Sequence, residues 1–222
     1  MKKIFLLILL TAAIQSLFAQ AVSFGVKAGL NESTATFTGT TSTFSNLPGF
    51  NAGVFADIKV NRLSVEPGIF YTTSGYNSKS VFTTDNPAPY SFSATGKVAY
   101  NYLEVPVNVL YNIPAGPLKI FVGAGPYWGL ALSGTRQGTA NANGIITNIR
   151  GNITFGSSDG DFSKTDLGVN AIGGIALKNG LLFSANYGFG LTNISNSTNS
   201  INSTQSKGEN KVLSLSLGYE FL

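Results

Sequence analysis

The sequence predicts an all-β protein, an eight-stranded antiparallel up-and-down transmembrane β-barrel. Three observations predict it: segments that alternate apolar and polar residues, connections that alternate between short and long, and a polar face rich in glycine. The composition agrees, with 43% hydrophobic residues, 11% charged residues and 26 glycines. Such a balance is typical of all-β chains with many tight turns and argues against disorder.

The N-terminus resembles a secretory signal peptide. Lys2 and Lys3 supply a positive start, residues 4–10 form an unbroken apolar run, and Ala19-Gln20-Ala21 has the small residues of a cleavage site. The run is too short for a transmembrane helix, and a buried N-terminal helix is the weaker alternative. We expect residues 1–21 to be the signal peptide, cleaved after Ala19 or Ala21, and residues 22–222 to form the barrel domain.

Eight segments of the remaining chain have the period-two pattern of strands. Residues 181–192 show it best, because Leu181 and Phe183 share one parity while Ser184 and Gly188 share the other. The segments are 22–31, 49–60, 63–76, 98–111, 117–132, 164–178, 181–192 and 213–221. Most exceed the usual strand of about five or six residues and reach the roughly nine to eleven that cross a bilayer when tilted.

The connections between these segments alternate in length. Residues 61–62, 112–116 and 179–180 are short, whereas residues 32–48, 77–97, 133–163 and 193–210 are long. With a periplasmic N-terminus, every short turn lies in the periplasm and every long loop outside, as in outer-membrane barrels. Both termini then share the periplasmic side. Within the third long loop, residues 145–155 alternate weakly and are expected to extend as a hairpin beyond the membrane.

The polar parity has the character of a crowded barrel interior. It carries many glycines, which a narrow eight-stranded lumen requires and a solvated surface does not. The charged residues inside the strands share this parity, so we expect a luminal charge network of Lys27, Asp57, Lys59, Glu66, Glu104, Lys119, Asp166, Lys178 and Glu220. Bulky side chains of the same parity are expected to fill the lumen: Phe55, Phe70, Tyr102, Phe121, Tyr127 and Ile172.

The apolar parity carries aromatic residues near both ends of the segments. An aromatic girdle at each membrane interface is typical of outer-membrane barrels. We expect Phe50, Tyr71, Trp128 and Phe189 in the outer girdle and Phe24, Tyr111, Phe183, Tyr219 and Phe221 in the inner one. Pro67, Pro106 and Pro126 interrupt the strand pattern and should mark bulges or unpaired ladder positions, because a closed barrel has no free edge.

Several motifs together resemble the PorT-type outer-membrane β-barrel domain family, which is similar in architecture to OmpX and OmpA barrels. They are residues 24–31 (FGVKAGLN), 49–53 (GFNAG), 102–106 (YLEVP), 123–127 (GAGPY) and 217–221 (LGYEF). The resemblance covers nearly the whole mature chain and implies an outer-membrane location and insertion by the barrel-assembly machinery. It implies no single activity. The family's usual terminal aromatic is here Phe221, followed by Leu222.

The sequence argues against enzymatic chemistry. It contains no Cys and no His, so it has no thiolate, imidazole or disulfide. Residues 156–160 match G-x-S-x-G around Ser158, but they lie in a polar loop without a histidine partner. Gly123-x-Gly125 precedes a proline inside a strand, and Asp159, Asp161 and Asp166 lack EF-hand spacing. We therefore expect no catalytic residue, metal or cofactor.

The charge balance gives no sign of nucleic-acid binding. Without Lys2 and Lys3 the chain has 12 basic and 10 acidic residues, a net charge of +2, with no basic stripe. The expected partners are outer-membrane lipid, the barrel-assembly machinery during biogenesis, and an extracellular or secretion-machine protein.

Three functions remain open. The first is a non-enzymatic outer-membrane protein with a structural or surface-recognition role through its long extracellular loops. The alternative, implied by the resemblance to PorT, is an accessory subunit of a protein-secretion or motility machine. The third is a soluble lipocalin-like ligand-binding barrel, which requires the apolar face to point inward.

Overall fold

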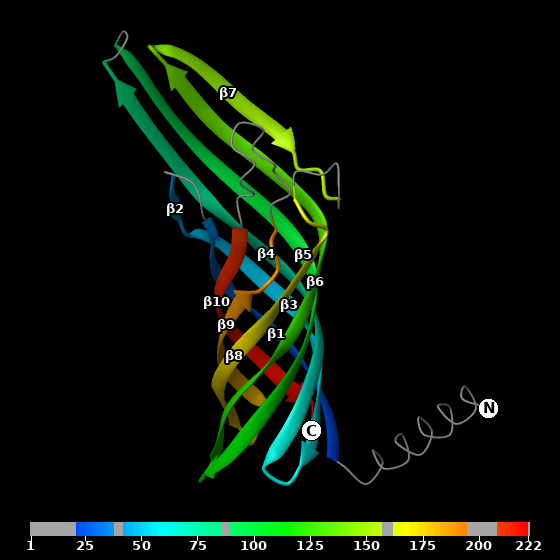
Figure 1. Ribbon diagram of the computed structural model, residues 1–222. Coiled ribbons are helices and arrows are strands. Elements are labelled where there is room, and N and C mark those ends of the chain that lie inside the picture. Colours follow the sequence, from blue (N-terminus) through cyan, green and yellow to red (C-terminus); the bar gives the residue numbers. More distant parts are fainter. Residues whose placement is uncertain (1–20, 38–41, 86–88, 157–161, 195–207, 222) are drawn as a thin grey trace, which may run out of the picture.

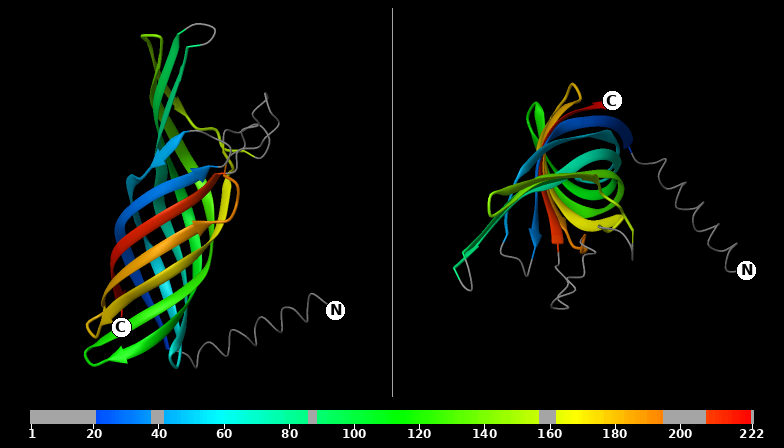
Figure 2. Two further views of the ribbon diagram at one scale, coloured as in Figure 1. Left: turned by 60° about the vertical axis from the view of Figure 1, so that its left-hand side comes forward. Right: turned by 90° about the horizontal axis from the view of Figure 1, so that it is seen from above.

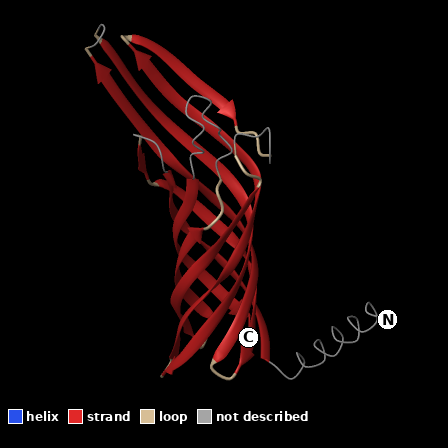
Figure 3. Ribbon diagram, in the orientation of Figure 1, coloured by secondary structure: helices blue, strands red, loops and turns tan. Residues whose placement is uncertain are grey.

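Ten strands make up nearly all of the described chain (Figures 1 and 3). The computed structural model describes residues 21–37, 42–85, 89–156, 162–194 and 208–221. The predicted signal peptide, except Ala21, lies outside these residues. The strands are β1 (Ala21–Phe37), β2 (Thr43–Ser45), β3 (Leu47–Val60), β4 (Leu63–Thr84), β5 (Tyr90–Ala115), β6 (Leu118–Ala142), β7 (Ile145–Asn152), β8 (Thr165–Leu177), β9 (Leu181–Gly190) and β10 (Gly208–Phe221).

Eight of these strands close into a barrel. The antiparallel ladder runs β1–β3–β4–β5–β6–β8–β9–β10, and β10 pairs with β1 from Phe24↔Phe221 to Phe37↔Gly208. Within the described part of the chain, β2 pairs only with β4 and β7 pairs only with β6, so both are edge strands that lie outside the closed ring. The view from above in Figure 2 shows the strands curving around one axis. The predicted eight-stranded up-and-down barrel is confirmed.

The barrel is apolar outside and polar inside. Phe24 is 62% exposed, whereas Lys27, which has the opposite parity on the same strand, is only 5% exposed. The same alternation holds around the wall. Leu30, Val54 and Ile69 lie outside, and Asn31, Asn51 and Glu66 lie inside. This is the arrangement of a membrane barrel, in which lipid solvates the outer face. A lipocalin-like barrel would have the opposite arrangement.

No helix in the described part of the chain is long and apolar enough to cross a membrane.

Three central strands run far beyond the other five. β4, β5 and β6 contain 22, 26 and 25 residues, and they rise above the rest of the barrel in Figures 1 and 2. Residues 76–84 of β4, 90–99 of β5 and 133–142 of β6, together with β7, form a four-stranded sheet that we call the projecting sheet. The short strand β2 pairs with the edge of this sheet at Asn77–Lys79 of β4. The predicted hairpin at residues 145–155 is present over Ile145–Asn152, but the prediction of residues 77–97 as a loop was wrong.

The three prolines lie at interruptions of the ladder. Pro67 has no paired partner in β3, Pro106 has none in β4, and Pro126 has none in β5, although the register continues on both sides of each gap. Proline has no N–H to donate, so a ladder bond is lost wherever it enters a strand. The expected unpaired positions are confirmed, and a bulge occurs separately between Asn101 and Tyr102.

Candidate functional site

A group of charged side chains closes the end of the lumen where the short turns lie. Lys59 forms an ion pair with Glu220 and lies 3.6 Å from an Asp57 carboxylate oxygen. Lys119 lies 3.6 Å from the same Asp57 oxygen and 3.8 Å from Glu220. The Ser23 hydroxyl donates a hydrogen bond to Glu220. Four charges from β3, β6 and β10 thus balance one another across the barrel axis.

A second ion pair lies deeper in the lumen. The Lys27 ammonium donates to a Glu66 carboxylate oxygen at 2.6 Å, and both side chains are buried. The Lys27 nitrogen also lies 4.2 Å from the centre of the Phe55 ring. A buried cation between a carboxylate and an aromatic ring is held firmly, because no water is present to solvate the ammonium or the carboxylate if they separate.

Lys178 differs from its expected position. It follows β8 in the turn that leads to β9, and its side chain is exposed. The parity of residues 164–178 put it in the lumen, but the strand ends at Leu177, so the alternation no longer applies. The other eight residues of the expected network lie on the luminal face.

Two apolar layers block the lumen above the group of Asp57, Lys59, Lys119 and Glu220. The lower one contains Phe55, Leu110, Phe121, Ile172, Ala176 and Leu182, with Phe70 packed against it. The upper one contains Ala35, Tyr76, Tyr100, Tyr102, Ala131, Ile153 and Ile194. The order Leu110, Asn108, Glu104, Tyr102 along β5 separates the two layers by a polar zone. This zone encloses a cavity of about 70 Å³, enough for roughly five water molecules.

Two carboxylates in the polar zone have no cationic partner among the described residues. Asp166 accepts hydrogen bonds from Asn210 at 2.8 Å, Thr192 at 2.8 Å and Tyr127 at 3.4 Å. Glu104 faces the same cavity. Amides and hydroxyls therefore solvate the Asp166 carboxylate, whereas the Glu66 carboxylate, which lines the same cavity, is paired with Lys27. No cluster of three or more metal-ligating side chains occurs within the described ranges.

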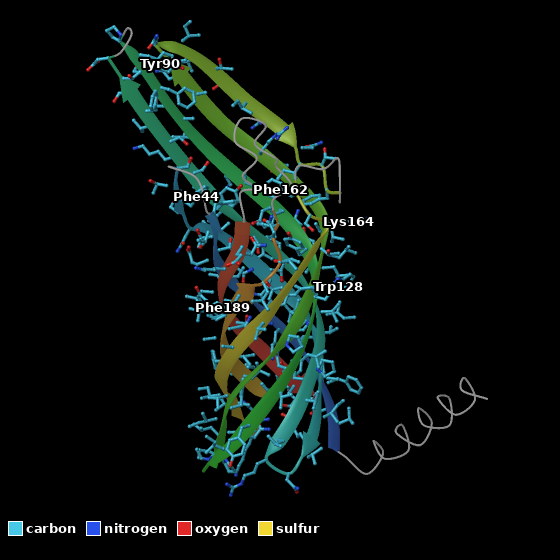
Figure 4. The ribbon with its side chains drawn as sticks, in the orientation of Figure 1. Phe44, Tyr90, Trp128, Phe162, Lys164 and Phe189 are labelled. Carbon is cyan, nitrogen blue, oxygen red and sulfur yellow. The ribbon has the colours of Figure 1, made fainter. Side chains whose placement is uncertain are left out.

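The aromatic residues expected in the two girdles lie on the outward face. All nine residues of the expected girdles are exposed on the outer wall. Phe24 pairs with Phe221 at the lower level, while the Phe50 and Tyr71 rings lie 5.8 Å apart at the upper one. Figure 4 labels Trp128 and Phe189 on this wall. Between Ile113 and Leu103 of β5 the apolar wall is about 24 Å tall at a tilt of about 45°, close to the usual height of roughly 25 Å.

The projecting sheet presents two different faces beyond this apolar wall. One face continues the lumen side and carries Phe82, Tyr90 and Ile145, of which Ile145 is 72% exposed. Tyr90 is labelled near the tip in Figure 4. The other face continues the lipid-facing side and carries Asn77, Lys97 and other polar side chains. Because the long connections of an outer-membrane barrel lie outside the cell, this sheet is the part of the wall that reaches the surroundings.

Sequence reasoning predicted only the 145–155 hairpin of the projecting sheet and missed the extensions of β4, β5 and β6, although one signal marks the β6–β7 turn. Asn143-Gly144 has φ values of 50° and 86°, the left-handed pair that a type I′ hairpin turn requires. The same dipeptide chemistry predicted the turn at Asn179-Gly180, where Gly180 has a φ of 90°. The predicted motif at residues 156–160 lies, apart from Gly156, outside the described residues.

A closed eight-stranded ring with an apolar belt, outward-facing aromatic residues and a charged, plugged lumen defines an integral outer-membrane β-barrel. The sequence profile of the outer membrane protein beta-barrel domain family matches residues 18–196. The chain belongs to this family and is an outer-membrane protein that sits in the membrane lipid.

Solved structures of other outer-membrane proteins are similar to this chain. Neisserial surface protein A is 15% identical, over 90% of this chain and 99% of that chain, with a TM-score of 0.40. Ail, the attachment invasion locus protein of Yersinia pestis, is 12% identical, over 90% and 98%, with a TM-score of 0.40. A major outer membrane protein from Thermus thermophilus is 14% identical, over 90% and 100%, with a TM-score of 0.40. No curated protein matches the sequence.

Proposed function

We propose that this protein is a non-enzymatic surface-recognition protein, in which the barrel anchors the projecting sheet outside the membrane. The observation that carries the proposal is the continuation of β4, β5 and β6 beyond the apolar belt as one hydrogen-bonded sheet. A binding surface on a rigid scaffold loses little conformational freedom when a partner binds.

The lumen supports this role more than a transport role. Two apolar layers and a charged layer occupy it, and the cavity between the apolar layers is small. An eight-stranded barrel has an interior that side chains fill. The chain also has no His or Cys to supply the usual catalytic bases, nucleophiles or metal ligands.

A chain with a shortened sheet tests the proposal. Tyr76, Val98, Arg136 and Gly151 form one cross-strand row. Residues 77–97 and 137–150 are each replaced by Asn-Gly, which closes two-residue hairpins at this row. The barrel and both apolar layers remain, so the shortened chain should reach the outer membrane and run faster on a gel when unboiled.

The binding assay compares cells that carry either chain. Cells are applied to an array of envelope glycolipid headgroups, bacterial polysaccharides and extracellular proteins. We expect binding by the full chain to at least one class and loss of that binding by the shortened chain. Equal binding by both chains, or no binding by the full chain, would reject surface recognition; loss of detergent resistance in the shortened chain would instead favour a structural role in the envelope.

A second candidate, an accessory subunit of a secretion or motility machine, is favoured by one feature. Among the described residues, β7 pairs only with β6, so its outer edge presents backbone groups to a partner strand. Crosslinking from Asn148 of β7 should then capture a component of such a machine, and the same crosslinker at Val54 on the lipid-facing wall serves as the control. Equal recovery from both positions would count against this function.

A further inference from the structure

A shallow groove crosses the projecting sheet perpendicular to its strands. One side is a cross-strand row of Asn77, Lys97, Gln137 and Arg150, and the other is a row of Lys79, Thr95, Thr139 and Asn148. The floor between them is the backbone of the intervening row, Ser78, Gly96, Gly138 and Ile149, whose parity is opposite to that of the two sides. The groove between the two rows has a volume of about 850 Å³.

The chemistry of the groove suits an anionic sugar. Lys79, Lys97 and Arg150 provide three cations, and none of them forms an ion pair with a described residue. The four strand segments of the sheet contain no Asp or Glu. The remaining side chains are mainly hydroxyls and amides, which both donate and accept hydrogen bonds, as sugar hydroxyls do. Cations bind phosphate groups through charge-assisted hydrogen bonds.

The groove lies on the face of the sheet that continues the lipid-facing side of the barrel wall. Along β4 the outward residues are Leu63, Ile69 and Tyr71 in the apolar belt, and Asn77 and Lys79 share their parity. From Tyr71, which pairs with Leu103 at the end of the belt, to Asn77 the strand rises about 20 Å, or about 14 Å along the membrane normal at a tilt of about 45°. Lipid headgroups occupy roughly 5–8 Å on each side of the hydrocarbon core. The groove therefore lies above the phospholipid headgroups, at the level of the sugars of membrane glycolipids.

We propose that this groove binds the phosphorylated sugar headgroups of glycolipids in the outer leaflet that surrounds the barrel. The inference rests on the proposed recognition function and names the ligand of one face of the projecting sheet. The charge of the groove, its hydrogen-bonding groups and its height above the belt all favour a membrane glycolipid. A soluble polyanion would not be concentrated on the lipid-facing side of the wall.

The test uses the full chain in nanodiscs of zwitterionic phospholipid. The probe is the water-soluble, deacylated headgroup of a phosphorylated outer-leaflet glycolipid, and the same headgroup after enzymatic removal of its phosphates is the first control. The variant Lys79→Gln/Lys97→Gln/Arg150→Gln removes three charges from the groove. Its matched control, Arg62→Gln/Lys164→Gln/Lys178→Gln, removes three charges from exposed positions outside it.

We expect the phosphorylated headgroup to bind, and binding to weaken about tenfold on dephosphorylation or in the groove variant, because exposed ion pairs contribute modestly but add across three sites. The matched control should bind as the unchanged chain does. Equal binding by the groove variant, or preference for a sulfated polysaccharide over the headgroup, would overturn the inference. If the groove variant binds normally while the shortened chain loses another array ligand, the proposed function stands and only the glycolipid assignment fails.

Discussion

At the scale of single residues, the burial of Lys27 and Glu66 makes each dependent on the other. Their nitrogen and oxygen are 2.6 Å apart inside the lumen. Removing one partner from a buried ion pair leaves an uncompensated charge, whereas removing both leaves none. The sequence could place these residues on one face by parity, but it could not pair them, because pairing depends on how β1 and β4 are placed around the barrel.

We predict that Lys27→Met lowers the free energy of unfolding by about 3 kcal/mol. The double variant Lys27→Met/Glu66→Gln should recover most of this loss, because the unpaired carboxylate is also removed. Urea unfolding of the barrel in lipid vesicles, followed by tryptophan fluorescence of Trp128, measures both. A double variant as unstable as the single one would show that the pair matters through packing against Phe55 instead.

Two adjacent glycines on β8 provide a test of the luminal packing. A Cβ atom added to Gly174 would lie 2.2 Å from the Phe183 carbonyl oxygen and 2.4 Å from the Phe121 ring, whereas one added to Gly173 has no neighbour closer than 3.7 Å. We predict that Gly174→Ala destabilises the barrel by about 1–3 kcal/mol and that Gly173→Ala changes stability by less than about 0.5 kcal/mol. The same urea experiment compares them, and equal losses would contradict a tight lumen.

At the scale of elements, the sequence predicted the strands where lipid and lumen impose opposite chemistry on alternate residues. The predicted segment 181–192 agrees closely with β9 (Leu181–Gly190). β4 and β5 were predicted too short because both faces of their outer parts meet water, so the alternation fades at Asn77 and Lys97. Where neither face of a strand meets an apolar environment, the sequence does not alternate, and the residues of the turns are the remaining local signal. Asn143-Gly144 is such a signal for the β6–β7 turn.

The Asn143-Gly144 turn should control the β6–β7 hairpin without affecting the barrel. Gly144 has a φ of 86°, which a β-branched residue adopts only with strain. We predict that Gly144→Val increases amide hydrogen exchange across the Ile145–Asn152 strand while the heat-modified gel shift persists. Gly151→Ala, where the nearest neighbour of the new Cβ is 3.6 Å away, is the control and should leave exchange unchanged.

At the scale of the whole molecule, the lumen is blocked at two separate levels. The lower layer includes Phe55 and Phe121, and the upper layer includes Tyr100 and Tyr102. The sequence predicted bulky luminal residues, but it offered no reason to expect two layers. Tyr100 and Ile153 come from segments that were assigned to different structural roles, and they meet only because the long strands bring them together.

We predict that ion conductance rises only when both layers are opened. Phe55→Ala/Phe121→Ala alone and Tyr100→Ala/Tyr102→Ala alone should remain as closed as the unchanged chain in planar bilayers. The fourfold variant should conduct small ions. Each protein must first show the faster unboiled band, which confirms a folded barrel; conductance in either paired variant would mean that one layer is permeable.

The unbroken length of β5 has a mechanical meaning. Its 26 residues span about 86 Å from the short turns of the barrel to the tip of the projecting sheet. The strand itself is continuous, although its pairing with β6 shifts by one residue between Asn101 and Tyr102, where the anchored part meets the free part. A pull on the tip along the strands loads many backbone hydrogen bonds in shear at once, so they resist together instead of opening one after another. The barrel wall and the projecting sheet therefore respond to force as one mechanical unit. Tension from a surface attached to the sheet is transmitted along the strands to the part of the barrel in the membrane.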